Sequence, residues 1–225
     1  MDFPIKPSKL VYKYFEHIKS KNSEFLLDSG AFTLMRNKHK QFNLDDLLSK
    51  YCFYINEFDI QNFFELDLDE LMPIEDVEEL RKKIYLETHK MPILVWHKER
   101  NQEYWTRMCK ENEFIAIGGM AHRNSQKVAV DIDFYREMVD EAHTYNTRVH
   151  GLGFTPMEML NAHTVFFDTV DSTTWVGGRH GISFALEDGK LKKVPLRNIF
   201  ACDSSEKDLE VWAKFCEEYR GTIRT

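Results

Sequence analysis

Cysteine is scarce in this chain, and its cysteines stand far apart. Among 225 residues there are four, and none forms a Cys-x-x-Cys pair: Cys52, Cys109, Cys202 and Cys216. This spacing argues against a structural zinc site built from cysteine pairs, and we expect neither a metal nor a cofactor. Isolated cysteines without a secretory leader predict a reducing, cytoplasmic location, which would be the host cytoplasm for a viral protein.

The sequence also lacks long apolar runs, linkers and an excess of basic residues. No run approaches the roughly 20 apolar residues that a membrane-spanning helix needs, so no membrane partner is expected. No Pro/Ser/Gly-rich linker and no repeat divides the chain, which predicts a single domain over residues 1–225. The net charge of −7 excludes a generally basic coat for nucleic acid but leaves room for a local basic strip.

Short apolar runs alternate with charged segments of helical periodicity. Residues 74–90 place Val77, Leu80 and Ile84 at helical spacing, and residues 131–145 have the same character. A steady succession of strand and helix is typical of a parallel α/β fold. The strand runs are apolar on both faces, as expected where helices cover the sheet.

Polar residues and glycines follow these apolar runs. They are Asp28, Asp67, His97, Gly118-Gly119, Gly151–Gly153 and Asp171. Chemistry gathers at the carboxyl ends of parallel strands, both in (β/α) barrels and in open sheets. Six such ends, with no GxGxxG after the first strand, favour a compact TIM-like (β/α) barrel. Residues 181–186 and 197–202 are candidates for the remaining strands, and the Asp-Gly turn between them predicts a β-hairpin insertion around 182–196.

Several carboxylates are expected at one rim of this fold. Asp28 ends the first run, where it either caps the next segment or acts as a working acid. Asp69 is expected to be a cap or a solvated residue, and Asp168 precedes Asp171 by three positions. Facing carboxylates shift each other's pKa, so one can hold a proton while another stays ionised. Such a pair can cleave a glycosidic bond.

Glycine and histidine supply further candidates. Gly118 and Gly119 follow a strand, where backbone N–H groups could approach a flat ligand closely, although a simple turn explains them equally well. His97 ends another strand run and is either structural or functional. His150, in the stretch HGLGFTP, is assigned a structural role.

Three motifs in order resemble the tRNA-guanine transglycosylase family. They are DSGAF at 28–32, IGGMA at 117–121 and FDTVDSTTWVGGRHG at 167–181. The short chain, ELDLD and DSTTW are more similar to the phage and bacterial DNA branch of that family (DpdA-type). The resemblance implies a tRNA-guanine transglycosylase-like barrel. The cysteine-rich zinc subdomain of the tRNA enzymes has no counterpart here.

The resemblance also implies a mechanism of base exchange with two catalytic aspartates. A nucleophilic aspartate would displace guanine from C1′ through a covalent glycosyl-enzyme, and a 7-deazaguanine would then displace the enzyme. Keeping the D-x-x-D pattern makes Asp171 the nucleophile, whereas matching Phe-Asp directly would choose Asp168. Asp28 matches the family's acid/base aspartate.

The same match assigns residues that hold the base and the nucleic acid. Asp67 would accept hydrogen bonds from the guanine edge, and His97 stands where the tRNA enzymes have a glutamine. The expected base-binding set is Ser29, Asp67, His97, Gly118, Gly119 and Met120. The expected contacts to the nucleic-acid backbone are Arg179, Arg36 and Lys38, the last two from the basic stretch at 35–40.

The sequence therefore predicts a glycosyltransferase that exchanges guanine in DNA for a 7-deazaguanine such as 7-cyano-7-deazaguanine. A base inside a duplex would have to be flipped out or already single-stranded. Three alternatives stay open: a tRNA-guanine transglycosylase, a nucleoside or glycoside hydrolase on the same barrel, and a non-catalytic nucleic-acid-binding relative. A homodimer or an accessory protein is also left open.

Overall fold

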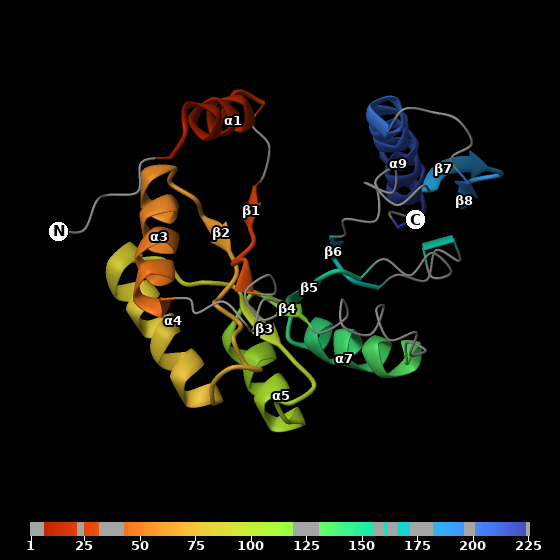
Figure 1. Cartoon of the computed structure of the whole chain (residues 1–225). Coiled ribbons are helices and arrows are strands. Elements are labelled where there is room, and N and C mark those ends of the chain that lie inside the picture. Colours follow the sequence, from red (N-terminus) through yellow and green to blue (C-terminus); the bar gives the residue numbers. More distant parts are fainter. Residues whose placement is uncertain are drawn as a thin grey trace. The chain divides into compact units, whose positions relative to one another are not determined.

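The computed structural model describes residues 7–21, 25–31, 43–118, 131–154, 160–161, 166–171, 182–195 and 201–223 (Figure 1). The chain divides into two compact units, Met1–Met108 and Cys109–Thr225, and each is described by itself. Within the described ranges, every helix is too short or too polar to cross a membrane.

The first unit is built from parallel strands joined by helices. Its elements are α1 (Lys9–Ser20), β1 (Leu26–Leu27), α3 (Leu44–Glu57), β2 (Asn62–Phe63), α4 (Ile74–Thr88) and β3 (Leu94–Trp96), followed by α5 (Gln102–Glu111). β1 pairs in parallel with β2, with Leu27 opposite Phe63. One residue further on, Phe64 bridges in parallel to Ile93, just before β3. The predicted parallel α/β character is confirmed here.

Local signals in the sequence account for where these helices begin and end. Asn43 caps α3, because its Oδ1 accepts from the backbone N–H groups of Asp45 and Asp46. α4 begins after Pro73, whose fixed φ suits a helix start, and it ends at His89 in a left-handed conformation (φ 57°). The helix predicted over 74–90 is therefore confirmed, but it ends two residues earlier, at Thr88.

The core of the first unit lies between the helices and the strands. α3 contributes Leu48 and Ile55, and α4 contributes Leu80 and Ile84. These side chains pack with Phe63 and with Leu66 and Leu68 of the following segment. α1 joins the same core through Phe15, whose ring stacks on Phe58 at a centroid distance of 4.0 Å. The apolar periodicity of the two helices thus faces the strands, as their sequences predict.

The described part of the second unit contains three parallel strands. β4 (Phe114–Ile117) pairs with β5 (Arg148–Gly151), and β5 pairs with β6 (Thr169–Val170). α7 (Ile132–Thr144) joins β4 to β5, and Asp131 caps it by accepting from Phe134 N–H. The helix predicted over 131–145 is confirmed. Gly151 is required at the end of β5, because a Cβ there would lie 2.8 Å from Cβ of Phe154.

A hairpin and a long helix follow. β7 (Ile182–Glu187) and β8 (Lys190–Pro195) pair in antiparallel register around Asp188 and Gly189, whose φ angles of 52° and 71° are those of a type I′ turn. The predicted hairpin is confirmed. α9 (Ala201–Ile223) packs on it: the Trp212 ring lies 5.4 Å from that of Phe184.

One strand prediction is wrong at the two positions where it can be tested. Residues 197–202 were expected to form a strand, but Ala201 and Cys202 begin α9, and the other four positions lie outside the described residues. A short apolar stretch cannot by itself be told from the first turn of a helix. Residues 182–186 do form a strand, but in the described structure its partner is the antiparallel β8. The described elements establish a mixed α/β fold with parallel sheets, and the barrel stays a prediction.

Two aliphatic side chains of equal size on α4 provide a test of which face of this helix is buried in the core. Ile84 is fully buried whereas Leu86 is 69% exposed. We expect Ile84→Ala to lower the free energy of unfolding by about 2–5 kcal/mol, through lost burial and the cavity left behind, and Leu86→Ala by less than about 0.5 kcal/mol. Urea unfolding followed by tryptophan fluorescence measures both. Equal losses would contradict the assigned faces of α4.

Candidate functional site

The predicted functional residues that can be placed lie where parallel strands end. In the first unit, Asp28 follows β1, Asp67 lies beyond β2 and His97 follows β3. In the second unit, Gly118 follows β4 and Asp171 follows β6. The sequence pattern thus located the carboxyl ends of the strands correctly.

A tight turn holds Asp28 at the end of β1. Asp28 Oδ1 accepts from Gly30 N–H at 3.2 Å. Gly30 has a φ of 72°, a backbone conformation that is strained for any residue with a side chain. This is the bond of a capping aspartate, so the structure is compatible with both interpretations of Asp28. Burial, followed by the charges of Asp28 and Asp67, raises the pKa of Tyr51 well above its ordinary value. The two carboxylates therefore lie near the same phenol.

Asp67 is held from two sides. Ser29 donates to Oδ1 at 3.1 Å, and His97 Nε2 lies 3.0 Å from Oδ2. Burial by itself lowers the pKa of His97, whose side chain is only 12% exposed. The hydrogen bond and the charge of Asp67 outweigh that effect, so the pKa of His97 lies above its ordinary value. The structure therefore brings three predicted base-binding residues into direct contact.

A fully buried carboxylate lies beside this group. Glu65 is 0% exposed, and its Oε1 accepts from Val95 N–H and from Arg100 Nη1, both at 2.8 Å. Arg100 also donates to both oxygens of Asp69, from Nε at 2.7 Å and from Nη2 at 2.8 Å. The expectation that Asp69 is a cap or a solvated residue is wrong, because a buried arginine binds its carboxylate through two parallel bonds.

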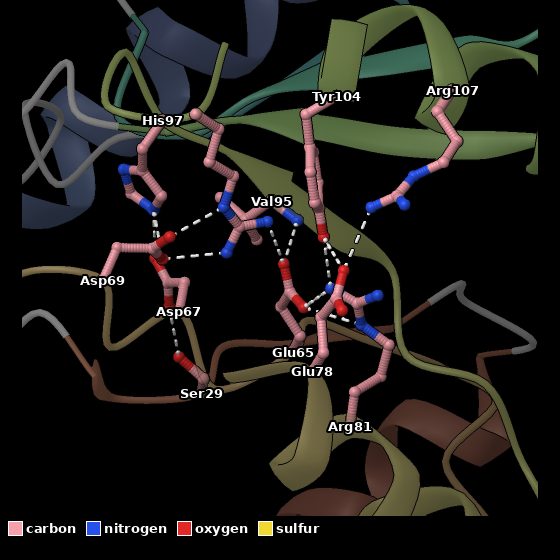
Figure 2. A network of polar contacts seen from close by, with 11 residues as sticks. Ser29, Glu65, Asp67, Asp69, Glu78, Arg81, Val95, His97, Tyr104 and Arg107 are labelled. Atoms are coloured by element: carbon pink, nitrogen blue, oxygen red, sulfur yellow. Dashed lines mark hydrogen bonds and ion pairs between the residues drawn. The ribbon is translucent and has the colours of Figure 1, made fainter. Parts of the chain in front are cut away.

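The second oxygen of Glu65 binds another arginine (Figure 2). Arg81 donates to Oε2 from Nε at 2.9 Å and from Nη2 at 2.6 Å. Tyr104 accepts from Arg81 and donates to Glu78, which also pairs with Arg107 at the surface. A continuous hydrogen-bonded network therefore runs from the exposed faces of α4 and α5 to Asp69.

A cavity of about 260 Å³ opens beside the Asp69–Arg100 pair. Its other described lining residues are Met72, Pro73, Ile74, Glu99, Asn101 and Tyr104. Asp67 and His97 are not among its described lining residues, so this cavity is not the predicted base-binding group.

Asp171 is the more exposed of the two candidate nucleophiles, with a side chain more accessible than that of Asp168. Its side chain is 57% exposed, and its Oδ1 accepts from Gly153 N–H at 2.7 Å and lies 3.2 Å from His150 Nε2. Burial raises the pKa of this carboxyl, but the hydrogen bonds from His150 and Gly153 outweigh burial, so the pKa lies below its ordinary value. Asp171 is therefore an accessible and ionised carboxylate.

Asp168 lies at the opposite end of the same strand. β6 consists of Thr169 and Val170, so Asp168 precedes the strand and Asp171 follows it. Asp168 Oδ2 accepts from Val149 N–H at 2.7 Å and lies 3.0 Å from His143 Nε2 on α7. These contacts connect β5, β6 and α7, which is a structural role.

His150 was assigned only a structural role from the sequence, but the structure also places it against Asp171. It is buried between Thr169 and Asp171, with Nδ1 2.8 Å from Thr169 Oγ1 and Nε2 at Asp171. Its position one residue before Gly151, at a strand end, was the available signal. The sequence analysis also missed the roles of Glu65 and Arg100, because no pattern in the neighbouring residues indicates that these two side chains bind each other.

Some predicted residues fall outside the described structure. They are Gly119, Met120, Arg179, Arg36 and Lys38. Gly118 is buried at the end of β4. Among the residues that can be placed, no three His, Cys, Asp or Glu side chains are grouped so as to hold a metal ion.

The Asp67–His97 pair leads to a prediction about pH. A histidine whose pKa is raised on folding adds stability below about pH 6.5, and this contribution is lost as the pH rises through the folded-state pKa. We expect Asp67→Asn to lower the pKa of His97, because burial is then opposed only by the charge of Asp69. NMR titration of His97 measures this, with Asp59→Asn, an exposed carboxylate paired to Lys90, as the control. An unchanged His97 titration would contradict the pairing.

Comparisons with known proteins identify no family for this chain. A scan against protein-family models finds none that matches, and a search of the curated proteins finds no similar sequence. The resemblance described above therefore rests on the motifs and on the positions that their residues take at the strand ends.

Proposed function

We propose that this protein is a DNA-guanine transglycosylase, which exchanges guanine for a 7-deazaguanine such as 7-cyano-7-deazaguanine on a compact (β/α) barrel. One observation carries the proposal: Asp171 is accessible and ionised at the carboxyl end of β6, whereas Asp168 has a structural role at the other end. A nucleophilic carboxylate needs both access and a low pKa. This favours Asp171 over Asp168 as the nucleophile.

The proposed reaction has two displacements at C1′ of the nucleotide. A carboxylate oxygen of Asp171 forms an ester with C1′ as the bond to guanine breaks, and Asp28 gives a proton to the leaving base. The incoming 7-deazaguanine then gives a proton to Asp28 and attacks C1′, which breaks the ester and restores Asp171. Two inversions give net retention. His150 and Gly153 orient the carboxylate through Oδ1, which leaves Oδ2 as the attacking atom.

The base would be read by the group around Asp67. A carboxylate oxygen can accept more than one hydrogen bond, so Asp67 suits the adjacent N1–H and amino donors of guanine, and a histidine beside it suits a ring acceptor. Ser29 and His97 hold Asp67 at 3.1 and 3.0 Å, so its orientation is set before the base arrives. Such preorganisation lowers the cost of binding.

The β7–β8 hairpin offers basic side chains for the nucleic acid. Lys190, Lys192 and Lys193 lie on β8, and Lys192 also pairs with Glu187 of β7. Lysines neutralise phosphates independently of sequence, so this contribution should fall with rising salt. The acidic chain would thus approach DNA through local patches.

The function is tested by base exchange with labelled 7-cyano-7-deazaguanine. We expect label to enter guanine-containing DNA and not tRNA, and Asp171→Asn to reduce the rate by at least about 10³-fold because the covalent intermediate is lost. Asp168→Asn is the matched control and should retain exchange once corrected for its folded fraction, measured by circular dichroism.

Other outcomes of that assay are informative. Label in tRNA alone would favour a tRNA-guanine transglycosylase. Release of guanine without incorporation would identify a hydrolase, with water as the final acceptor. Loss of exchange with Asp168→Asn but not with Asp171→Asn would contradict the assigned nucleophile.

His150 leads to a second prediction, about the pH dependence of exchange. Its hydrogen bond helps to lower the pKa of Asp171, so His150→Gln should raise that pKa. The acidic limb of the kcat profile, which reports ionisation of the nucleophile, should then move to higher pH. His143→Gln, which changes the histidine beside Asp168, should leave that limb in place. Equal shifts in both variants would contradict the role of His150.

A further inference from the structure

His97 has two carboxylates within reach of the same nitrogen. Nε2 lies 3.0 Å from Asp67 Oδ2 and 3.9 Å from Asp69 Oδ2. Only the shorter distance is a hydrogen bond. A small rotation of either aspartate would exchange the two hydrogen-bond partners of His97. A further contact is therefore needed to keep Asp67 as the partner.

Arg100 restrains the competing carboxylate. Its Nε and Nη2 donate to the two oxygens of Asp69 at 2.7 and 2.8 Å, which fixes the plane of that carboxylate. Parallel bonds of this kind are the strongest that a guanidinium makes, and a lysine cannot reproduce them. Figure 2 shows Asp67 and Asp69 both lying below His97.

Glu65 fixes Arg100 in turn. Arg100 Nη1 donates to Oε1 of the fully buried Glu65 at 2.8 Å, and Val95 N–H donates to the same atom. Arg100 itself is buried at 5% exposure. A buried guanidinium with bonds to two carboxylates has one allowed position, so the orientation of Asp69 follows from that of Glu65.

We propose that Arg100 is a positioning residue for the base-binding pair: anchored on Glu65, it holds Asp69 off His97 and so reserves the imidazole for Asp67. The inference rests on the proposed function only for its ligand, a heterocycle with two adjacent N–H donors. The positioning by Arg100 should affect only the binding of the base, because it governs the orientation of Asp67 and does not involve the nucleophile.

The charged groups that face His97 are Asp67, Asp69 and Arg100. The carboxylates raise the pKa of His97 and the guanidinium lowers it. In Arg100→Lys, an ammonium cannot bind Glu65 and both oxygens of Asp69 together. Asp69 then competes for Nε2, and the carboxylate of Asp67 loses its fixed orientation.

Three variants separate positioning from a purely structural role. Arg100→Lys releases Asp69. Arg100→Lys combined with Asp69→Asn releases the side chain but removes its charge. Arg81→Lys is the matched control, because Arg81 binds Glu65 without touching Asp69. NMR titration of His97 and calorimetric binding of 7-cyano-7-deazaguanine are measured in each, at equal folded fraction.

We expect the pKa of His97 to rise in Arg100→Lys, to fall back in the double variant and to stay unchanged in Arg81→Lys. The dissociation constant for 7-cyano-7-deazaguanine should rise about tenfold in Arg100→Lys and return to within about threefold of the parent in the double variant, as coupled neighbours do. In the exchange assay, the change should appear in KM for the base with kcat retained.

Rescue by the double variant is the decisive result. If both arginine variants weaken binding equally, or if the double variant is worse than Arg100→Lys, the network is merely structural and the proposal is overturned. Should Arg100→Lys not fold, Asp69→Asn alone replaces it: affinity within about threefold of the parent supports the proposal, and a tenfold loss overturns it. If the parent protein does not bind the base, the proposed function fails, while the His97 titration still tests the positioning role.

Discussion

The buried carboxylate of Glu65 is the interaction on which the candidate site of the first unit depends. An ion removed from water is costly unless partners surround it, and Glu65 has two arginines and a backbone N–H. Exposed pairs such as Lys50–Asp46 contribute little by comparison. Because Arg100 connects Glu65 to Asp69, the burial of one charge determines where the other polar groups lie. The site therefore belongs to the core of the fold as much as to its surface.

The two units hold their carboxylates in different ways, and each way suits a different task. Asp67 is enclosed by Ser29 and His97 and is fixed in orientation, which suits recognition of a ligand's edge. Asp171 is exposed and is stabilised through one oxygen by His150 and Gly153, which keeps it ionised but accessible. In the proposed reaction, the group that recognises the base needs rigidity, whereas the nucleophile needs an accessible lone pair.

Much of this fold could be predicted from local patterns, but the contacts of the site could not. Periodicity gave α4 and α7, and the polar residue after each apolar run gave the strand ends, because both depend on neighbouring residues alone. Arg100 binds a glutamate 35 positions earlier, and His150 binds an aspartate 21 positions later. Nothing near Asp69 indicates that an arginine 31 positions away will enclose it. The strand expected at 197–202 is wrong at Ala201 and Cys202, because a short apolar stretch fits a helix start equally well.

The brevity of β6 has a consequence for how this chain can change. Its two residues separate an aspartate that ties β5 to α7 from an aspartate that faces solvent. Each residue added to a strand advances the chain by about 3.3 Å and turns the following side chains to the other face. An insertion or deletion here would therefore misplace one carboxylate or the other. Among related chains, the number of residues between these two aspartates should therefore vary less than the types of the residues that lie between them.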